Sequence, residues 1–161
     1  MKERILSTEV AKHLGERVRV QGWLHVVRRL GGVTFIIVRD GWGTVQAMTE
    51  QIDAVPVAGG TTVGELIVES VIALEGRVVA ASQAPGGVEL HDPTIELITA
   101  VREQPPVVIN KREIKASIGT VLDHAVVVNR HPGRRAIFKM SATAMAAFRE
   151  HLGKRGFTEV Q

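Results

Sequence analysis

Hydrophobic and polar residues alternate in the segment 18–48. Three runs rich in Val, Ile and aromatic residues follow one another there, and glycines separate them at 31–32 and at 41–43. Short alternating runs interrupted by glycine-bearing turns are typical of antiparallel strands. In the first run, Val20 and Leu24 fall on one face, and the polar side chains fall on the other. The sequence therefore predicts three consecutive strands, the first with a clear apolar face.

Two further strands are predicted after a loop. Residues 50–66 contain proline, glycine and one short helical pattern, so we expect a loop with a helical turn. A fourth strand is expected over 70–81, bent at Gly76, and a fifth over 88–98, interrupted at 92–93. This order predicts a mainly β protein, a five-stranded Greek-key barrel of the OB-fold type. A five-stranded SH3-like barrel is the alternative.

Helical and linker patterns flank the predicted barrel. A hydroxyl pair, a short apolar-faced segment and a terminal glycine predict a short N-terminal helix over 7–15. Residues 101–120 are rich in proline and charge, which is typical of a linker. The apolar segment 121–129 fits a strand or another apposed segment. A 3–4 residue apolar spacing predicts one long amphipathic helix over 135–152, and 157–160 has the pattern of a beginning strand.

The composition is that of a folded protein without cysteine chemistry. The 161 residues are 45% hydrophobic and 23% charged, which is typical of globular rather than disordered chains. The absence of cysteine excludes disulfides and thiolate metal sites. No apolar run approaches the roughly 20 residues of a membrane span. The N-terminus has no secretory pattern, so we expect a cytoplasmic protein without membrane contact.

Charge is distributed unevenly along the chain. Residues 1–100 carry 9 Lys and Arg against 12 Asp and Glu, a net charge of −3, whereas residues 101–161 carry 11 against 5, a net charge of +6. Binding of nucleic acid by the strand-rich part therefore requires a local cluster of cations, such as Arg28, Arg29 and Arg39. A competing interpretation of 39–40 is an intrachain ion pair at a turn.

The three predicted strands carry side chains suited to single-stranded nucleic acid, at the end of the first strand and within the second and third. Arg28 supplies a cation for phosphate, Phe35 an aromatic surface for a base, and Gln46 an amide for a base edge. OB barrels bind oligonucleotides on the face of their second and third strands, where Phe35 and Gln46 are expected. Because its strand is mostly apolar, Phe35 fits either face, and a core aromatic is the competing interpretation. The six histidines show no ligand spacing, so we expect no metal site, and no catalytic arrangement is recognisable.

Two separated stretches carry a resemblance to a known family. The first consists of Gly22-Trp23-Leu24-His25, Arg28, Gly31-Gly32, Phe35, Arg39-Asp40, Gly43 and Gln46. The second consists of Ala136 to Met140, Ala147 to Glu150 and Gly156 to Val160. The first stretch resembles the anticodon-binding OB domain of aspartyl- and asparaginyl-tRNA synthetases. The second resembles the motif 1 helix and strand that begin the class II catalytic domain and form the dimer interface of that family.

The resemblance implies a role for several residues. Phe35 matches the aromatic that stacks on the middle anticodon base, and Gln46 matches the amide that hydrogen-bonds this base. Arg28 matches the cation that contacts the same base or its neighbour, with Arg29 beside it. Glu89 is similar to the carboxylate that reads the first anticodon base.

His25 and Pro85 are similar to the pair found in the non-discriminating subgroup of this family, which accepts both aspartate and asparagine tRNAs.

The resemblance also implies what to expect from the chain as a whole. We predict an OB-fold anticodon-binding domain over 1–100, a linker over 101–120, and a truncated start of the class II catalytic domain over 121–161. Motifs 2 and 3 are absent, so we expect no cofactor and no aminoacylation here, since ATP and magnesium belong to the missing catalytic domain. The expected partners are a tRNA anticodon loop and a second copy bound through the 135–152 helix. The alternative is a stand-alone OB-fold module that binds single-stranded nucleic acid or dimerises.

Overall fold

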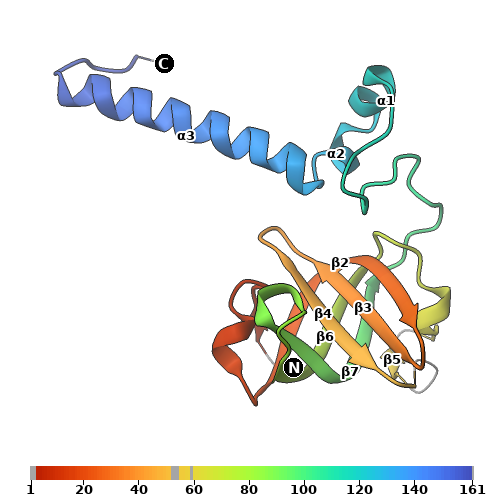
Figure 1. The fold of residues 1–161 in the computed structure, drawn as a ribbon. Helices are drawn as coiled ribbons and strands as arrows, with labels where there is room; N and C mark the ends of the chain where they lie inside the picture. The colour runs from red at the N-terminus through yellow and green to blue at the C-terminus, as the bar shows by residue number, and fades with distance from the viewer. Residues whose placement is uncertain (1–2, 52–54, 59, 161) are drawn as a thin grey trace. The chain divides into compact units, whose positions relative to one another are not determined.

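The structure of the protein, a computed structural model, describes residues 3–51, 55–58 and 60–160. The chain divides into two compact units, Met1–Gln104 and Pro105–Gln161, and each is described by itself. The described strands of the first unit, drawn as arrows in Figure 1, are β1 (Arg4–Ile5), β2 (Arg17–Leu30), β3 (Val33–Arg39), β4 (Thr44–Thr49), β5 (Val57–Ala58), β6 (Val71–Ala80) and β7 (Val88–Thr99). Short 3-10 helices lie at Val10–His13, Val63–Glu65 and Pro85–Gly87.

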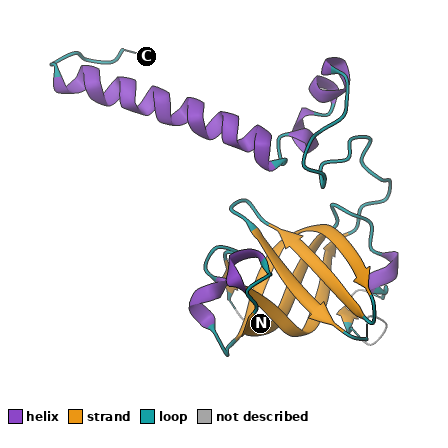
Figure 2. Ribbon diagram, viewed as in Figure 1, coloured by secondary structure: helices purple, strands orange, loops and turns teal. Residues whose placement is uncertain are grey.

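Five of these strands close into a barrel. The sheet runs in the order β1-β2-β3-β4-β7-β5, and β6 pairs with both β2 and β7, so that β2, β3, β4, β7 and β6 form a ring. The ribbons in Figures 1 and 2 show this curved, closed sheet. The ring joins β4 to β7 in parallel and its other neighbours antiparallel. The predicted five-stranded OB-fold is confirmed, and the SH3-like alternative is therefore wrong.

The inner face of the ring forms the core of the first unit. Val20, Leu24 and Ile36 are fully buried there, as is Leu90 of β7, which confirms the apolar face predicted for the first strand. Gly22 is required at its position because a Cβ would overlap the carbonyl oxygen of Arg39 on the neighbouring strand. Burial of each large aliphatic side chain contributes about 1.5–3 kcal/mol to stability.

The predicted bend at Gly76 is a bulge between β6 and β7. The register shifts between Glu75 and Arg77, where 92–93 of β7 lie opposite. A Cβ on Gly76 would lie 2.8 Å from the Cβ of Leu90, so a larger residue does not fit here. The fifth strand is therefore continuous, and the expected interruption at 92–93 is wrong, because a bulge accommodates these residues without ending the strand.

Loops and turns of the first unit follow the prediction with small differences. The short N-terminal helix is the 3-10 helix at Val10–His13. The helical turn after the third strand is the 3-10 helix at Val63–Glu65, which has a capping box formed by Thr62 and Glu65. The predicted loop also contains the two-residue strand β5. Residues 52–54 and 59 of this loop lie outside the described residues.

Asp40 fastens the turn between β3 and β4 to the N-terminal segment. Its carboxylate accepts hydrogen bonds from the backbone N–H and hydroxyl of Ser7, at 2.8 and 2.7 Å. It also accepts the backbone N–H groups of Trp42 and Gly43, at 2.7 and 2.8 Å. The predicted turn at 41–43 is thus closed by a buried carboxylate with four donors.

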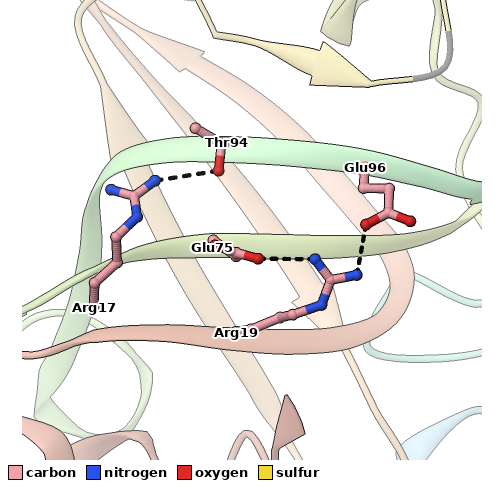
Figure 3. A network of polar contacts seen from close by, with 5 residues as sticks. All are labelled: Arg17, Arg19, Glu75, Thr94 and Glu96. Atoms are coloured by element: carbon pink, nitrogen blue, oxygen red, sulfur yellow. Dashed lines mark hydrogen bonds and ion pairs between the residues drawn. The ribbon is translucent and has the colours of Figure 1, made fainter. Parts of the chain in front are cut away.

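A network of polar contacts on the outer face ties β2 to β6 and β7 (Figure 3). Arg19 donates to Glu75 at 2.8 Å and to Glu96 at 2.6 Å, and its side chain is 7% exposed. These hydrogen bonds raise the pKa of Arg19 above its ordinary value. Arg17 donates to Thr94 at 3.2 Å. Arg19 lies on the polar face of β2, and its two ion pairs connect this strand to β6 and β7.

Arg39 forms a buried ion pair with Glu69. One guanidinium nitrogen, Nη2, lies 2.7 and 2.9 Å from the two carboxylate oxygens, and the side chains are only 2% and 3% exposed. The guanidinium also lies 5.5 Å from the centre of the Trp23 ring and 2.9 Å from His25 Nδ1. Glu69 has a φ of 74°, a strained conformation for a residue with a side chain. The suggested ion pair within 39–40 is therefore wrong, because the two side chains bind separate partners.

The described part of the second unit is helical. It contains α1 (Ile118–Asp123), α2 (Ala125–Val128) and α3 (Pro132–Lys154). Val107, Ile109 and Val128 form a small apolar cluster. His131 begins α3, since its side chain accepts the N–H of Gly133 at 3.1 Å. Of the helices in the described residues, none is long and apolar enough to cross a membrane.

The sequence patterns of this unit were only partly predictive. The long helix is confirmed and extends slightly beyond 135–152. The strand suggested for 121–129 is wrong: the segment is helical, and the Ser117 side chain caps α1 by accepting the N–H of Thr120. An apolar run of this length does not distinguish a strand from a helix. The strand start expected at 157–160 is wrong as well, because no described segment of this unit forms a neighbouring strand.

Acid should remove the stabilisation that Asp40 provides. Burial by itself raises the pKa of this carboxyl, but the donors of Ser7, Trp42 and Gly43 outweigh it and lower the pKa below its ordinary value. A lowered native pKa contributes stability above the unfolded pKa of about 3.9, and this contribution is lost as pH falls through the native pKa. We expect Asp40→Asn to cost about 1–3 kcal/mol at neutral pH and less at low pH. Urea unfolding from neutral pH to about pH 2 measures this, and a pH-independent difference would contradict it.

Breaking the buried ion pair should destabilise the barrel strongly. Arg39→Met deprives the buried Glu69 carboxylate of its guanidinium partner, so we expect a loss of about 3–5 kcal/mol in the free energy of unfolding. The double variant Arg39→Met, Glu69→Gln removes both charges and should recover part of that loss. Urea unfolding of both variants measures the difference. A double variant no more stable than the single one would show that the uncompensated carboxylate is not the cause.

Candidate nucleic-acid interface

The outer face of the barrel is hollowed over β2, β3, β4 and β7. The hollow has a volume of about 950 Å³, and the segment 81–84 forms a further part of its wall. Five of the residues singled out in the sequence line it: Arg28, Arg29, Phe35, Gln46 and Glu89. The two arginines are exposed, and the other three side chains are half-buried. Residues from separate parts of the sequence therefore share one concave surface.

Strand register explains why these side chains face outward. Phe35 lies opposite Arg28 of β2 and opposite Met48 of β4. Their neighbours Ile36 and Ala47 are fully buried in the core, and successive side chains of a strand point to opposite faces. Phe35 is therefore on the outer face, so the interpretation as a core aromatic is wrong.

Gln46 and Glu89 are brought together by the parallel pairing of β4 with β7. The pair Ala47 and Leu90 sets the register of the two strands. Gln46 Nε2 donates to Glu89 Oε2 at 3.1 Å, and His91 Nε2 lies 2.9 Å from Glu89 Oε1. The carboxylate is thus held between an amide and an imidazole, with its side chain 14% exposed.

His91 is a member of this site that sequence reasoning missed. It follows Glu89 by two positions in β7, and alternation in a strand puts such residues on the same face. This spacing was a usable signal.

Three other predicted residues do not line the hollow. His25 contacts Arg39, and Pro85 begins the 3-10 helix after Ala84, which does line the hollow. Arg39 itself is buried and paired with Glu69. Its inclusion in a phosphate-binding cluster is therefore wrong, and Arg28 and Arg29 remain as cations of the hollow.

A second hollow of about 610 Å³ adjoins the first. Met48 lines both, and His91 and Arg17 line the second. Polar side chains therefore continue past Glu89 along the outer face.

The larger hollow offers an aromatic surface, an amide, a carboxylate and two guanidinium groups. These groups can stack on, hydrogen-bond and neutralise an unpaired nucleotide.

Comparisons with known proteins identify the family to which the barrel belongs. The family described as OB-fold nucleic acid binding domain matches residues 18–98. Aspartate–tRNA(Asp/Asn) ligase of Deinococcus radiodurans is 37% identical over 158 residues, which is 98% of this chain and 34% of the relative. The ligase of the same name from Methanopyrus kandleri is 40% identical over 146 residues, 91% of this chain and 33% of the relative. The chain thus spans about a third of these relatives.

Solved structures give the same result. The crystal structure of asparaginyl-tRNA synthetase from Pyrococcus horikoshii complexed with asparaginyl-adenylate matches with a TM-score of 0.79 and 34% identity, over 100% of this chain and 36% of that one. The resemblance noted in the sequence is confirmed. The chain belongs to the OB-fold nucleic acid binding domain family and matches the N-terminal part of aspartyl- and asparaginyl-tRNA synthetases.

Proposed function

We propose that residues 18–98 bind the anticodon loop of a tRNA of the aspartate or asparagine type. The observation that carries this proposal is the single hollow lined by Arg28, Phe35, Gln46 and Glu89. The curated relatives support the choice of ligand, since their names specify tRNA(Asp/Asn). The activity is recognition without chemistry, and no catalytic step is assigned to a residue of this chain.

In this proposal each side chain makes the contact with the RNA that suits its chemical group. Phe35 stacks on the middle anticodon base, and the Gln46 amide, which has both donors and an acceptor, reads the edge of that base. The Glu89 carboxylate only accepts hydrogen bonds, so it suits the N–H groups of a purine at the first position. Arg28 and Arg29 are exposed at the rim of the hollow and neutralise phosphate.

The proposal extends to specificity and to setting. His25 and Pro85, through their similarity to the non-discriminating subgroup, suggest that both aspartate and asparagine tRNAs are accepted. Ligation with ATP and magnesium is proposed only for a longer protein of the kind that the relatives represent. A tRNA ligand implies a cytoplasmic setting.

A second proposed activity is self-association through α3. Apolar side chains on this helix are largely exposed, with Ile137 at 57%, Met140 at 74% and Phe148 at 60%. The resemblance of this helix to the motif 1 helix supports a second copy of the chain as its partner. A module that binds single strands without anticodon preference remains the alternative to the first proposal.

Removing the stacking surface or the amide should weaken RNA binding. We expect Phe35→Ala to reduce affinity for an anticodon stem-loop with a central uridine about 5- to 150-fold, since a stacked base contributes roughly 1–3 kcal/mol. Gln46→Ala should cost a similar amount, because it loses a base-edge contact. Fluorescence anisotropy measures both affinities.

Trp42→Ala provides the matched control for these variants. Trp42 is an aromatic residue with 57% exposure in the β3–β4 turn and does not line the hollow, so its removal should leave affinity unchanged. Unchanged binding by Phe35→Ala and Gln46→Ala would refute the site. Equal competition by oligo-dT and by the cognate stem-loop would favour the general single-strand binder.

Self-association should depend on the apolar face of α3. We expect sedimentation to show a dimer and Phe148→Asp to raise its dissociation constant about tenfold or more, because an interface aromatic becomes a charge. Ala146→Asp is the matched control, since 3.6 residues per turn put it about 160° away around the helix. Equal dissociation by the two variants, or a monomeric wild-type chain, would contradict the dimer.

A further inference from the structure

His91 contacts the candidate recognition groups without lining the hollow in which they lie. It belongs to β7, and Arg77 of β6 lies opposite it in the sheet register. Its side chain is 27% exposed and faces Glu89 on one side, while the adjoining smaller hollow borders it on the other. The ring is therefore held on the outer face of the barrel and takes no part in the apolar core.

The hydrogen bonds of this group converge on the Glu89 carboxylate. An ionised carboxylate only accepts hydrogen bonds, so both nitrogens that face Glu89 must donate. His91 Nε2 lies 2.9 Å from one carboxylate oxygen, and Gln46 Nε2 lies 3.1 Å from the other. Each oxygen is thus fixed by one donor, and each retains capacity to accept another hydrogen bond.

This hydrogen-bond network also determines which way the Gln46 amide points. Because its NH₂ group faces Glu89, its carbonyl oxygen points away from the carboxylate. A carbonyl oxygen and the second N–H of the amide then remain for a base, and uracil offers the complementary N–H and carbonyl groups. If Glu89 were free to rotate, the amide would lose the partner that selects this orientation.

We propose that His91 is a positioning residue for base recognition, which acts by holding Glu89 and, through Glu89, Gln46 in the orientation that reads the bases. The inference rests on the proposed function, and it assigns His91 no contact with the RNA. Its physical basis is preorganisation, since a side chain ordered before binding does not lose its freedom on binding. The neutral ring must carry its proton on Nε2 to fill this role.

The test uses the full chain and two substitutions at one position. His91→Leu removes the donor, and we expect affinity for the cognate stem-loop to fall roughly 2- to 10-fold, the effect of ordering about one flexible side chain. His91→Gln keeps an N–H donor of similar reach and should retain most of the affinity. In a Glu89→Ala background, His91→Leu should cause no additional loss, because its effect passes through Glu89.

His13→Leu is the matched control for the loss of a histidine. His13 Nδ1 lies 3.0 Å from Glu16 Oε2, a histidine–glutamate contact of the same kind in the same unit, and neither residue lines the hollow. Its removal should leave RNA affinity unchanged. Thermal unfolding of each variant establishes that the barrel is intact at the temperature of the binding assay.

A second measurement does not require RNA. Nitrogen-15 NMR should show the His91 ring protonated at Nε2. The two side-chain amide protons of Gln46 should also differ from each other in chemical shift and in exchange rate, and this difference should be larger in wild type than in His91→Leu. An unchanged Gln46 amide, or an equal loss of affinity from His91→Leu with and without Glu89, would overturn the inference. If wild type and Phe35→Ala bind the cognate loop equally, the proposed function fails instead, and the Gln46 amide still decides whether His91 positions this network.

Discussion

The parallel pairing of β4 with β7 is the contact on which both the fold and the candidate site depend. It closes the ring of strands at Ala47 and Leu90, whose side chains are fully buried in the core. The same register places their neighbours Gln46 and Glu89 side by side on the outer face, 43 positions apart in the sequence. A shift of one residue would exchange the two faces, burying the polar pair and exposing the apolar one. Core packing therefore selects the geometry of the site.

Arginine serves two different purposes on the outer face of this barrel. Arg19 and Arg39 are paired with carboxylates and almost fully buried, so they link strands and loops. Arg28 and Arg29 lie at the exposed end of β2 beside the hollow. The two pairs of arginines differ in burial because carboxylates lie beside Arg19 and Arg39. The acidic composition of the first unit makes such carboxylates available for internal ion pairs. Arg28 and Arg29 are therefore the guanidinium groups that border the hollow.

Much of the fold could be predicted because strand periodicity and turn chemistry are local. The faces of β2 and the bulge at Gly76 follow from alternation and from a single glycine. Contacts between distant segments could not be predicted in this way. The partner of Arg39 is Glu69, 30 positions away in a loop, and adjacency in the sequence suggested Asp40 instead. The outward direction of Phe35 likewise could not be predicted without the register of the neighbouring strands, because apolar residues occur on both faces of its strand.

Under the proposed function, the hydrogen bonds already formed within the Gln46–Glu89–His91 group would affect which base is selected. All three side chains are partly buried, so a base that fails to replace or extend their hydrogen bonds leaves polar groups unpaired away from water. Such an unpaired group costs about 1–3 kcal/mol, whereas a matched hydrogen bond gains less than that on balance. Stacking on Phe35 tolerates any base, because every base has a π face. Affinity in this hollow is therefore expected to come mainly from stacking and phosphate contacts, and discrimination from the penalty that the polar group imposes on the wrong base.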